Sequence, residues 1–245
     1  MEETIDIDYS RHYSNWHKDT EEHIESTRKF YDSKILPYFP PDKSVAILDI
    51  GCGMGFLLNA LGHAGYKNIF GIDVDESQVK SCQQKGLSVS LVKDTVAYLK
   101  ENRGRFDVIA AFDVLEHIPP EAQILFIRAV HSALKVGGVF IASVPNATSV
   151  LASRNRYLDY THYVTFTEVS LDFVLYNAGF RKIAIHPMEY VRFSFTITSL
   201  IHFLLLKFFR TIRRLEMIAE LGTTWGKKVP LSFNLISVAE KTSTE

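Results

Sequence analysis

Apolar residues gather in short runs that end at turn residues, and segments with a helical spacing of apolar positions separate these runs. A short apolar run without strict polar alternation is typical of a strand that is buried on both faces of a parallel sheet. The predicted strands are 44–50, 68–74, 87–92, 106–114, 139–145, 181–188 and 232–241. The predicted helices are 20–36, 56–65, 75–86, 120–136 and 168–179.

Alternation of strands and helices at this spacing predicts an α/β fold, namely a Rossmann-like, doubly wound, mostly parallel seven-stranded sheet with helices on both faces. Residues 146–167 have no clear period and are predicted to form a long loop on the active side. We expect an N-terminal helical arm or cap in 1–40, a main domain in 41–190 and 229–245, and an apolar, basic helical insertion in 191–228.

Composition limits the classes of function. The 245 residues are 47% apolar, which is ample for a large core, and the formal net charge of −1 provides no global field for nucleic acid. With Cys52 and Cys82 as the two cysteines, a disulfide framework is not expected, and a reducing cytoplasm is the simpler expectation. The acidic first ten residues lack the apolar segment of a signal peptide.

A glycine-rich loop, "GCGMG", follows the first predicted strand and contains Gly51, Gly53 and Gly55. In an open α/β sheet this turn faces the ligand, and glycine leaves no Cβ between the backbone and that ligand. The dinucleotide fingerprint requires a further glycine where this chain has Phe56, so a different ligand is favoured. Asp73, at the end of the next strand, can accept hydrogen bonds from ribose hydroxyls, and Asp94 is placed to receive an adenine amino group.

The chain resembles the class I S-adenosylmethionine-dependent methyltransferases. The resemblance is carried in order by "LDIGCGMG", "GIDVD", "LVKD", "FDVIAAFDVLEHIP", "LKVGGVFIASVPN" and "HYVTFTEVSLDFVLYNAGF". It implies S-adenosyl-L-methionine as cofactor and S-adenosyl-L-homocysteine as product. It also implies that Gly51 and Gly53 line the methionine moiety, that Asp73 holds the ribose and that Asp94 lies at the adenine. The remaining predicted cofactor residues are Asp49, which helps to order the loop, Gly55, Val74, Thr95 and Phe112.

Asp113, Glu116 and His117 follow the fourth predicted strand at positions i, i+3 and i+4, so one helical turn would place them on one side. Three interpretations stay open. The stretch can be part of the cofactor pocket, as in many similar enzymes, or His117 can be a general base beside Glu116. As a minority hypothesis, all three can hold a divalent metal, because quinone-biosynthesis O-methyltransferases that this stretch resembles use a metal near here.

His162 is the second candidate for the base. In the family that the chain resembles, a histidine before the helix that ends in "AGF" often faces the substrate, and Asp159 is close enough in sequence to orient it. An ordered loop histidine without a catalytic duty is equally compatible with the sequence. Tyr9, His12, Trp16 and Arg28 are expected to fold over the cofactor or to pack on the surface.

The insertion contains "VRFSFTITSLIHFLLLKFFRTIRRLEMIAELG" at 191–222, and its uncharged run 193–206 is too short to span a bilayer. Three uses compete for it: a lid or dimer face, a peripheral membrane contact through 191–215, and a wall of the acceptor pocket. The protein is therefore expected in the cytoplasm, either free or at the inner face of the membrane, with a homodimer as one option.

Three hypotheses for the whole function follow. The first is O-methylation of a sugar hydroxyl in a glycan or lipid-linked glycan, because the chain resembles methyltransferases of bacterial polysaccharide biosynthesis. The second is O-methylation of a small phenolic or quinone-like acceptor, with Phe193, Phe195 and Phe203 lining the pocket. The third is a non-catalytic, cofactor-binding partner subunit. The [DN]PP[YF] motif of enzymes that methylate amino groups in DNA is absent, so nucleic acid is not the expected substrate.

Overall fold

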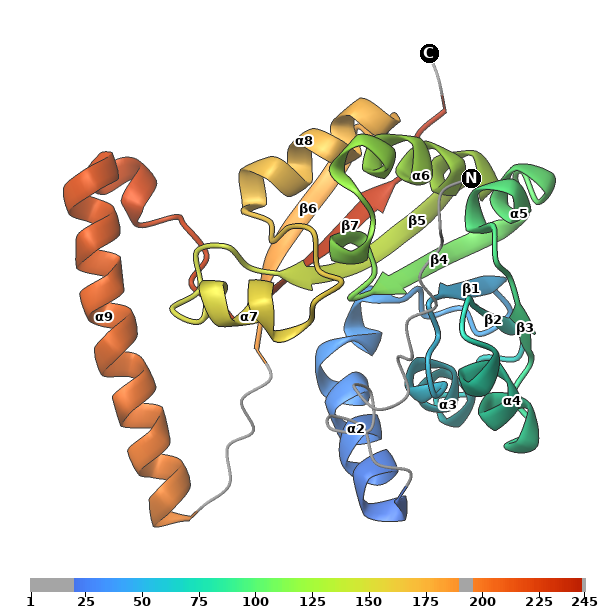
Figure 1. The fold of residues 1–245 in the computed structure, drawn as a ribbon, viewed down its shortest axis with the longest axis horizontal. Coiled ribbons are helices and arrows are strands. Elements are labelled where there is room, and N and C mark those ends of the chain that lie inside the picture. The colour runs from blue at the N-terminus through green and yellow to red at the C-terminus, as the bar shows by residue number, and fades with distance from the viewer. Residues whose placement is uncertain (1–19, 190–195, 244–245) are drawn as a thin grey trace.

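The computed structural model describes residues 20–189 and 196–243, and its centre is a seven-stranded sheet in the order β3-β2-β1-β4-β5-β7-β6 (Figure 1). The strands are β1 (Ile47–Ile50), β2 (Ile69–Asp73), β3 (Val89–Leu91), β4 (Phe106–Phe112), β5 (Leu134–Pro145), β6 (Lys182–Met188) and β7 (Asn234–Glu240). Every neighbouring pair is parallel except the two that β7 makes with β5 and β6. The predicted doubly wound, mostly parallel sheet is confirmed.

Strand order reverses between β1 and β4, and this reversal places the ligand-binding edge of the sheet. β1 leads on through β2 to β3 in one direction, whereas β4 and β5 continue in the other. A crevice opens beyond the carboxyl ends of the strands at such a point, because the connecting loops diverge to opposite faces. The segments that follow β1, β2 and β4 are therefore the ones that can surround a ligand.

Helices cover both faces of the sheet. The α-helices are α2 (Glu21–Lys34), α3 (Phe56–His63), α4 (Glu76–Gln84), α5 (Thr95–Glu101), α6 (Pro120–Ala133), α7 (Ala152–Leu158), α8 (Glu168–Ala178) and α9 (Ile197–Gly226), with short 3₁₀ turns at η1 (Leu36–Tyr38) and η2 (Leu115–His117). Figure 1 shows α5, α6 and α8 on one side of the sheet and α2, α3 and α4 on the other. Two main apolar cores result, one beneath each set of helices.

Local sequence explains where several helices begin and end. Asp75 caps α4 through the Ser77 and Gln78 amides, and Thr167 forms a reciprocal capping box with Ser170 at the start of α8. Gly179 ends α8 with a φ of 119°, a conformation that side chains with a Cβ rarely adopt. Asp75 and Thr167 thus fix helix starts at the carboxyl edge of the sheet, whereas Gly179 ends α8 at the opposite edge, where β6 begins.

Three features of the helices differ from the sequence prediction. The short helix α5 was not predicted, and α7 lies inside the predicted loop 146–167. Both have seven residues, which is too few for apolar periodicity to stand out. The predicted helix 120–136 ends at Ala133, because Leu134 already pairs with Phe106 as the first residue of β5.

The insertion between β6 and β7 forms the long helix α9, as the sequence predicts for a helical element before the last strand. Gly222, with φ of 76° and ψ of 165°, interrupts it near its end. None of the helices in the two described ranges combines the length and the apolar content that a bilayer crossing requires.

Candidate active site

The glycine loop turns sharply between β1 and α3. Gly51, Gly53 and Gly55 have φ values of 68°, 51° and 78°, so each occupies the left-handed region that favours glycine. A Cβ on Gly51 would lie 2.7 Å from the Val114 side chain. At Gly51 the loop therefore requires glycine for two reasons, its backbone conformation and the close approach of the chain after β4.

Asp73 links the loop to the next strand. Its carboxylate accepts hydrogen bonds from the Gly53 amide at 2.8 Å and from the Asp75 amide at 2.9 Å. Each oxygen keeps a second lone pair that can receive a ligand hydroxyl. Burial raises the pKa of Asp73, although its two amide donors favour the charged form.

An open groove of about 920 Å³ runs past this edge of the sheet, and we call it the strand-end groove. Most of the predicted cofactor residues lie along it together with the histidine that follows β4. They are Gly51, Asp73, Val74, Asp94, Thr95 and His117. The groove is mainly apolar in its walls. Polar residues line it at the ends of β2, β3 and β4, and further ones, Lys100, Arg103, Arg128 and Ser132, come from α5, the turn after it and α6.

Other predicted cofactor residues lie behind the groove wall. Asp49 is buried within β1, where burial and the nearby Asp73 charge hold its pKa well above the usual range. Phe112 packs edge-on against Tyr31 of α2, with ring centroids 6.1 Å apart. Gly55 lies against Leu87 and Cys82, so its missing side chain makes room for packing beside α4. Asp94 lines the groove but also caps α5 through the Ala97 amide.

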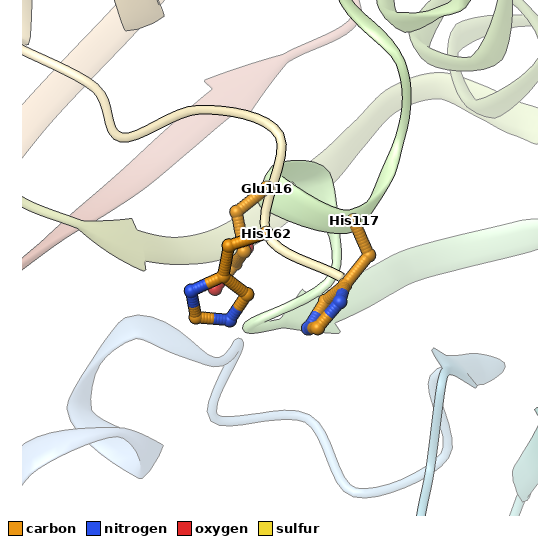
Figure 2. A group of neighbouring side chains, drawn as sticks. All are labelled: Glu116, His117 and His162. Carbon is orange, nitrogen blue, oxygen red and sulfur yellow. The ribbon is translucent and has the colours of Figure 1, made fainter. Parts of the chain in front are cut away.

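Next to the groove, Glu116 and His117 from the turn after β4 meet His162 from the loop after α7 (Figure 2). The two imidazole rings pack edge to face, with centroids 4.6 Å apart. One ligand-type atom from each of the three side chains lies within 4.8 Å of the others. The sequence predicted Glu116 and His117 as one group and His162 as a second candidate base, and the fold brings the three together.

His117 is supported by a short chain of hydrogen bonds. Its Nδ1 lies 2.7 Å from the Thr161 hydroxyl, which donates to the Asp159 carboxylate at 2.7 Å. Because that hydroxyl gives its hydrogen to Asp159, it accepts from Nδ1–H, and the lone pair of the neutral ring then resides on Nε2. Asp159 was predicted to orient His162, but its carboxylate reaches His117 through Thr161.

His162 is fixed in a similar way. Its Nδ1 lies 2.8 Å from the carbonyl oxygen of Asn155, which can only accept, so Nδ1 carries the hydrogen and Nε2 the lone pair. The Asn155 side chain is buried, and its amide nitrogen and oxygen have no hydrogen-bond partner among the described residues. Buried polar atoms in proteins are normally satisfied by protein groups or ordered water, so this amide is a candidate partner for a water or a polar ligand.

Glu116 is fully buried, and neither carboxylate oxygen has a hydrogen-bond partner within the described parts of the chain. Burial, together with the charges of Asp113 and Asp159, holds its pKa well above the usual range. A carboxyl group in this environment is either protonated, and can then donate a hydrogen bond, or charged, and then requires a cation or a hydrogen-bond donor beside it.

The metal hypothesis involved Asp113, Glu116 and His117. In the structure the Asp113 carboxylate accepts from Ser143 Oγ at 3.0 Å and from Asn234 Nδ2 at 2.8 Å, and its backbone has an unusual φ of 54°. The side chains whose ligand atoms lie close enough to hold one metal ion are instead Glu116, His117 and His162. One oxygen and two nitrogen ligands would suit a divalent cation such as Zn²⁺, and the same atoms would suit proton transfer.

The predicted cover over the cofactor lies mostly beyond the described residues. Tyr9, His12 and Trp16 fall outside the described ranges. The Arg28 guanidinium contacts Glu25 and Asp32 on its own helix, α2. The nearest part of α2 to the glycine loop is His23, which packs edge-on against Phe56 at the start of α3, with centroids 5.5 Å apart.

Sequence reasoning missed Thr161, Asn155 and Val114. Thr161 had one available signal, because an Asp two residues before a Thr commonly forms a local turn, and the Thr161 amide does donate to Asp159 at 2.8 Å. Asn155 and Val114 gave no such signal, since their roles depend on how distant segments meet.

Comparisons with known proteins agree with this geometry. The family model described as "Methyltransferase domain" matches residues 22–185. Among curated proteins, the ubiquinone biosynthesis O-methyltransferase of Pseudomonas aeruginosa is 36% identical over 104 residues, which are 40% of this chain and 44% of that protein. The Colwellia psychrerythraea protein of the same name is 32% identical over 130 residues, which are 51% of this chain and 47% of that protein. The chain thus matches less than half the length of these relatives.

Solved structures extend the likeness of the fold to nearly the whole chain. A SAM-dependent methyltransferase from Archaeoglobus fulgidus superposes with a TM-score of 0.68 at 23% identity, covering 95% of this chain and 99% of the other. A phosphoethanolamine N-methyltransferase 2 of Haemonchus contortus, solved with S-adenosyl-L-methionine, has a TM-score of 0.59 at 14% identity, covering 95% of this chain and 60% of the other.

Proposed function

The chain belongs to the methyltransferase-domain family, and from this premise we propose that it transfers the methyl group of S-adenosyl-L-methionine to a sugar hydroxyl of a glycan or lipid-linked glycan. The observation that carries the proposal is the meeting of Glu116, His117 and His162 beside the strand-end groove. A proton acceptor at the mouth of a cofactor groove is what O-methylation requires in addition to methyl-donor binding.

The residues along the strand-end groove fit the methyl donor. The Gly51 backbone lies open on its floor, Asp73 offers lone pairs for two ribose hydroxyls, and Asp94 with Thr95 reaches the adenine end. When bound, the donor supplies a methyl group on a positively charged sulfur. The chain's task is then to hold an acceptor hydroxyl in line with the carbon–sulfur bond and to take its proton.

In the proposed reaction the acceptor hydroxyl gives its proton to Nε2 of His117. The donor, when bound, would supply the methyl carbon to that oxygen, and the electron pair of its carbon–sulfur bond would stay on sulfur. The imidazolium that results is stabilised through Thr161 by the buried Asp159 carboxylate. Product release and loss of the His117 proton to solvent then return the site to its starting state.

The polar lining of the acceptor side supports a sugar. The buried side chains of Glu116 and Asn155 offer hydrogen-bonding atoms that have no partner within the described ranges, and neighbouring sugar hydroxyls would pair with them. An aliphatic hydroxyl is also a weaker acid than a phenol, whose pKa is about 10, so it depends more on a supported base. A lipid-linked glycan would place the reaction at the inner face of the membrane.

A phenolic or quinone-like acceptor is the second candidate, and the curated relatives named ubiquinone biosynthesis O-methyltransferase favour it. Their matches cover 40% and 51% of this chain, so they bear more on the shared domain than on the whole acceptor site. Phe203, one of the aromatic residues predicted for this pocket, lies on α9, while Phe193 and Phe195 fall outside the described residues.

The test is a measurement of S-adenosyl-L-homocysteine formation with panels of sugar nucleotides, lipid-linked glycans and phenolic acceptors. Turnover with a glycan and none with the phenols supports the first candidate, and the reverse supports the second. Binding of S-adenosyl-L-methionine in calorimetry without turnover of any acceptor would favour the non-catalytic partner subunit. His117→Gln serves as the control that keeps the fold and removes the proposed base.

A further inference from the structure

The first part of α9 exposes a continuous apolar side to solvent, which we call the apolar side of α9. Its members recur at the three- and four-residue spacing that brings side chains to one face of a helix. They are Ile197, Leu200, Ile201, Leu204, Leu205, Phe208, Phe209, Ile212 and Leu215, each between 42% and 79% exposed. So many adjacent large apolar side chains exceed the scattered exposure that is normal on a monomer, so this surface calls for an occupant.

No other described helix or strand covers this surface. α9 makes no extensive packing with any of them, and Figure 1 shows it standing apart from the sheet. Its orientation is fixed by Arg210, whose guanidinium makes a two-pronged ion pair with Glu189 at 2.6 and 2.8 Å. Arg210 and Phe208 are two positions apart, so they point in roughly opposite directions on a helix of 3.6 residues per turn. The ion pair therefore turns the apolar side away from the end of β6.

Bases outnumber acids in α9, and its two acids, Glu216 and Glu220, both lie beyond Leu215. From Ile197 to Leu215 the sequence contains no Asp or Glu, and its basic residues are Lys207, Arg210, Arg213 and Arg214. Arg213 pairs with Glu216 at 2.8 Å, whereas Arg214 donates to a neutral acceptor, the Gly226 carbonyl. The helix therefore keeps a net positive charge. A helix with Phe and Leu on one side and Lys and Arg on the other is the pattern of an interfacial membrane helix.

A second copy of the chain fits the apolar side less well. Ile201, Phe208 and Leu215 recur every seven residues, as the seam of a coiled coil requires. The positions beside this seam are Lys207 and Arg214 on one edge and Leu205 and Ile212 on the other. A parallel pair would find no acid opposite these bases, and an antiparallel pair would place base against base. An anionic lipid surface satisfies both the apolar side and the charge.

We propose that α9 docks the protein on an anionic bilayer, lying in the interface with its apolar side among the acyl chains and its remaining positive charge, that of Lys207 and Arg214, near the lipid phosphates. β6 runs parallel to β5, because both pair antiparallel with β7. β6 therefore ends at the same edge of the sheet as the other parallel strands (Figure 1), and the strand-end groove opens at that edge. Docking would bring this edge toward the membrane surface, where an acceptor carried by a lipid resides.

The inference goes beyond methyl transfer, and its test needs neither cofactor nor acceptor. The full chain is mixed with vesicles of phosphatidylcholine alone or of phosphatidylcholine with phosphatidylglycerol, and flotation is measured at low and high salt. We expect flotation with the phosphatidylglycerol vesicles, and weaker flotation without the anionic lipid or at high salt. Absence of flotation with every vesicle under every condition would overturn the proposal.

Two matched variants each introduce one glutamate. Phe208→Glu places it in the apolar side, and we expect the bound fraction to fall at least about tenfold, because a charge replaces buried aromatic area. His202→Glu places it about 120° around the helix from Phe208, at the margin of the apolar side, where α9 is also exposed. Binding is expected to stay within about fivefold of the unchanged chain, the effect of one charge near the lipid surface. Equal loss in both variants would contradict the assigned orientation.

Light scattering after size-exclusion chromatography shows whether the apolar side of α9 binds lipid or a second copy of the chain. A dimer of the unchanged chain that Phe208→Glu converts to monomer would assign the apolar side to self-association and overturn the membrane proposal. A monomer in both cases, with lipid binding in the unchanged chain alone, supports it. Thermal unfolding of each variant checks the fold, and turnover of a detergent-solubilised acceptor measures methyl transfer separately. Absence of flotation of the unchanged chain, together with normal turnover, therefore refutes only the docking.

Discussion

His117 Nδ1 lies 2.7 Å from the hydroxyl of Thr161, although the two residues are 44 positions apart in the sequence. The same hydroxyl donates a hydrogen bond to the carboxylate of Asp159, which is buried. A histidine held in one tautomer with a carboxylate behind it is the arrangement of a general base. The first two predictions follow from this chain of contacts.

Replacement of His117 by Gln is expected to lower kcat by about 10²–10⁴-fold, because the acceptor hydroxyl loses its proton acceptor. Binding of S-adenosyl-L-methionine, measured by calorimetry, should change little, since the ring lies at the margin of the strand-end groove. His162→Gln is the matched variant and should cost less, because the carboxylate support runs to His117. Unchanged turnover in both variants would refute base catalysis by this pair.

Thr161→Val removes the hydroxyl that joins His117 to Asp159 while preserving the shape of the side chain. We expect kcat to fall by about tenfold or more, and the acidic limb of the pH–rate profile to move to lower pH, because the imidazolium loses its link to a negative charge. Thr161→Ser keeps the hydroxyl and should restore both values. If the role of Thr161 is merely structural, the acidic limb of the pH–rate profile will stay at the pH found for the unchanged chain.

Asp73 tests the donor site. Asp73→Asn is expected to weaken S-adenosyl-L-methionine binding by about 10–100-fold, since one oxygen that accepts from a backbone amide, and that we propose accepts from a ribose hydroxyl, becomes a donor. Asp75→Asn, two residues on, keeps a capping side chain for α4 and should bind the donor normally. Calorimetry on both proteins decides the point. Equal affinities would remove Asp73 from the donor site.

Much of the sheet and the donor side could be predicted because both depend on local patterns. Apolar runs fix the strands, parallel strands share a carboxyl edge, and so Gly51 and Asp73 had to meet there. The acceptor side could not be derived in this way. His162 reaches His117 only because the loop after α7 folds back over the turn after β4, and the sequence between 146 and 167 has no period from which that path could be read.

Asp159 illustrates the same limit at the scale of one turn. Its nearness in sequence to His162 suggested that it would orient that ring. The local turn instead directs its carboxylate to the Thr161 amide and hydroxyl, so its support goes to the other histidine. Spacing in the sequence therefore identified the titratable residues of the site, whereas Thr161, Asn155 and the pairing among all of them depended on backbone geometry.

Glu116 is expected to make stability fall as pH rises. Its folded-state pKa is raised well above the unfolded value, which is about 4.3 for a glutamate, so the neutral form is the one that folding favours. The stabilisation is full below the unfolded pKa and is lost as pH rises toward the folded pKa. Glu116→Gln keeps the shape without the charge, and it should raise the Tm at pH 8 by at least about 2–4 °C, the shift that corresponds to 1 kcal/mol in a domain of this size.

The same substitution should have a smaller effect at pH 5, where Glu116 is protonated more fully in both states. Thermal unfolding monitored by circular dichroism between pH 5 and pH 8 provides the measurement. Glu121→Gln, at an exposed site in the first turn of α6, is the control and should show no comparable trend. A Tm difference for Glu116→Gln that is independent of pH would show that burial of its charge is not the cause.

Chelation distinguishes proton transfer from metal binding by Glu116, His117 and His162. Attack of an activated hydroxyl on a sulfonium methyl needs a proton acceptor, so we expect turnover to persist after dialysis against EDTA. Both Nδ1 atoms already contact protein oxygens, which leaves the lone pairs of Nε2 for the acceptor proton. His63→Gln, which changes an exposed histidine at the end of α3, controls for nonspecific metal binding. Loss of turnover after dialysis, restored by Mg²⁺ or Zn²⁺ in the unchanged chain, would instead assign the three side chains to a cation.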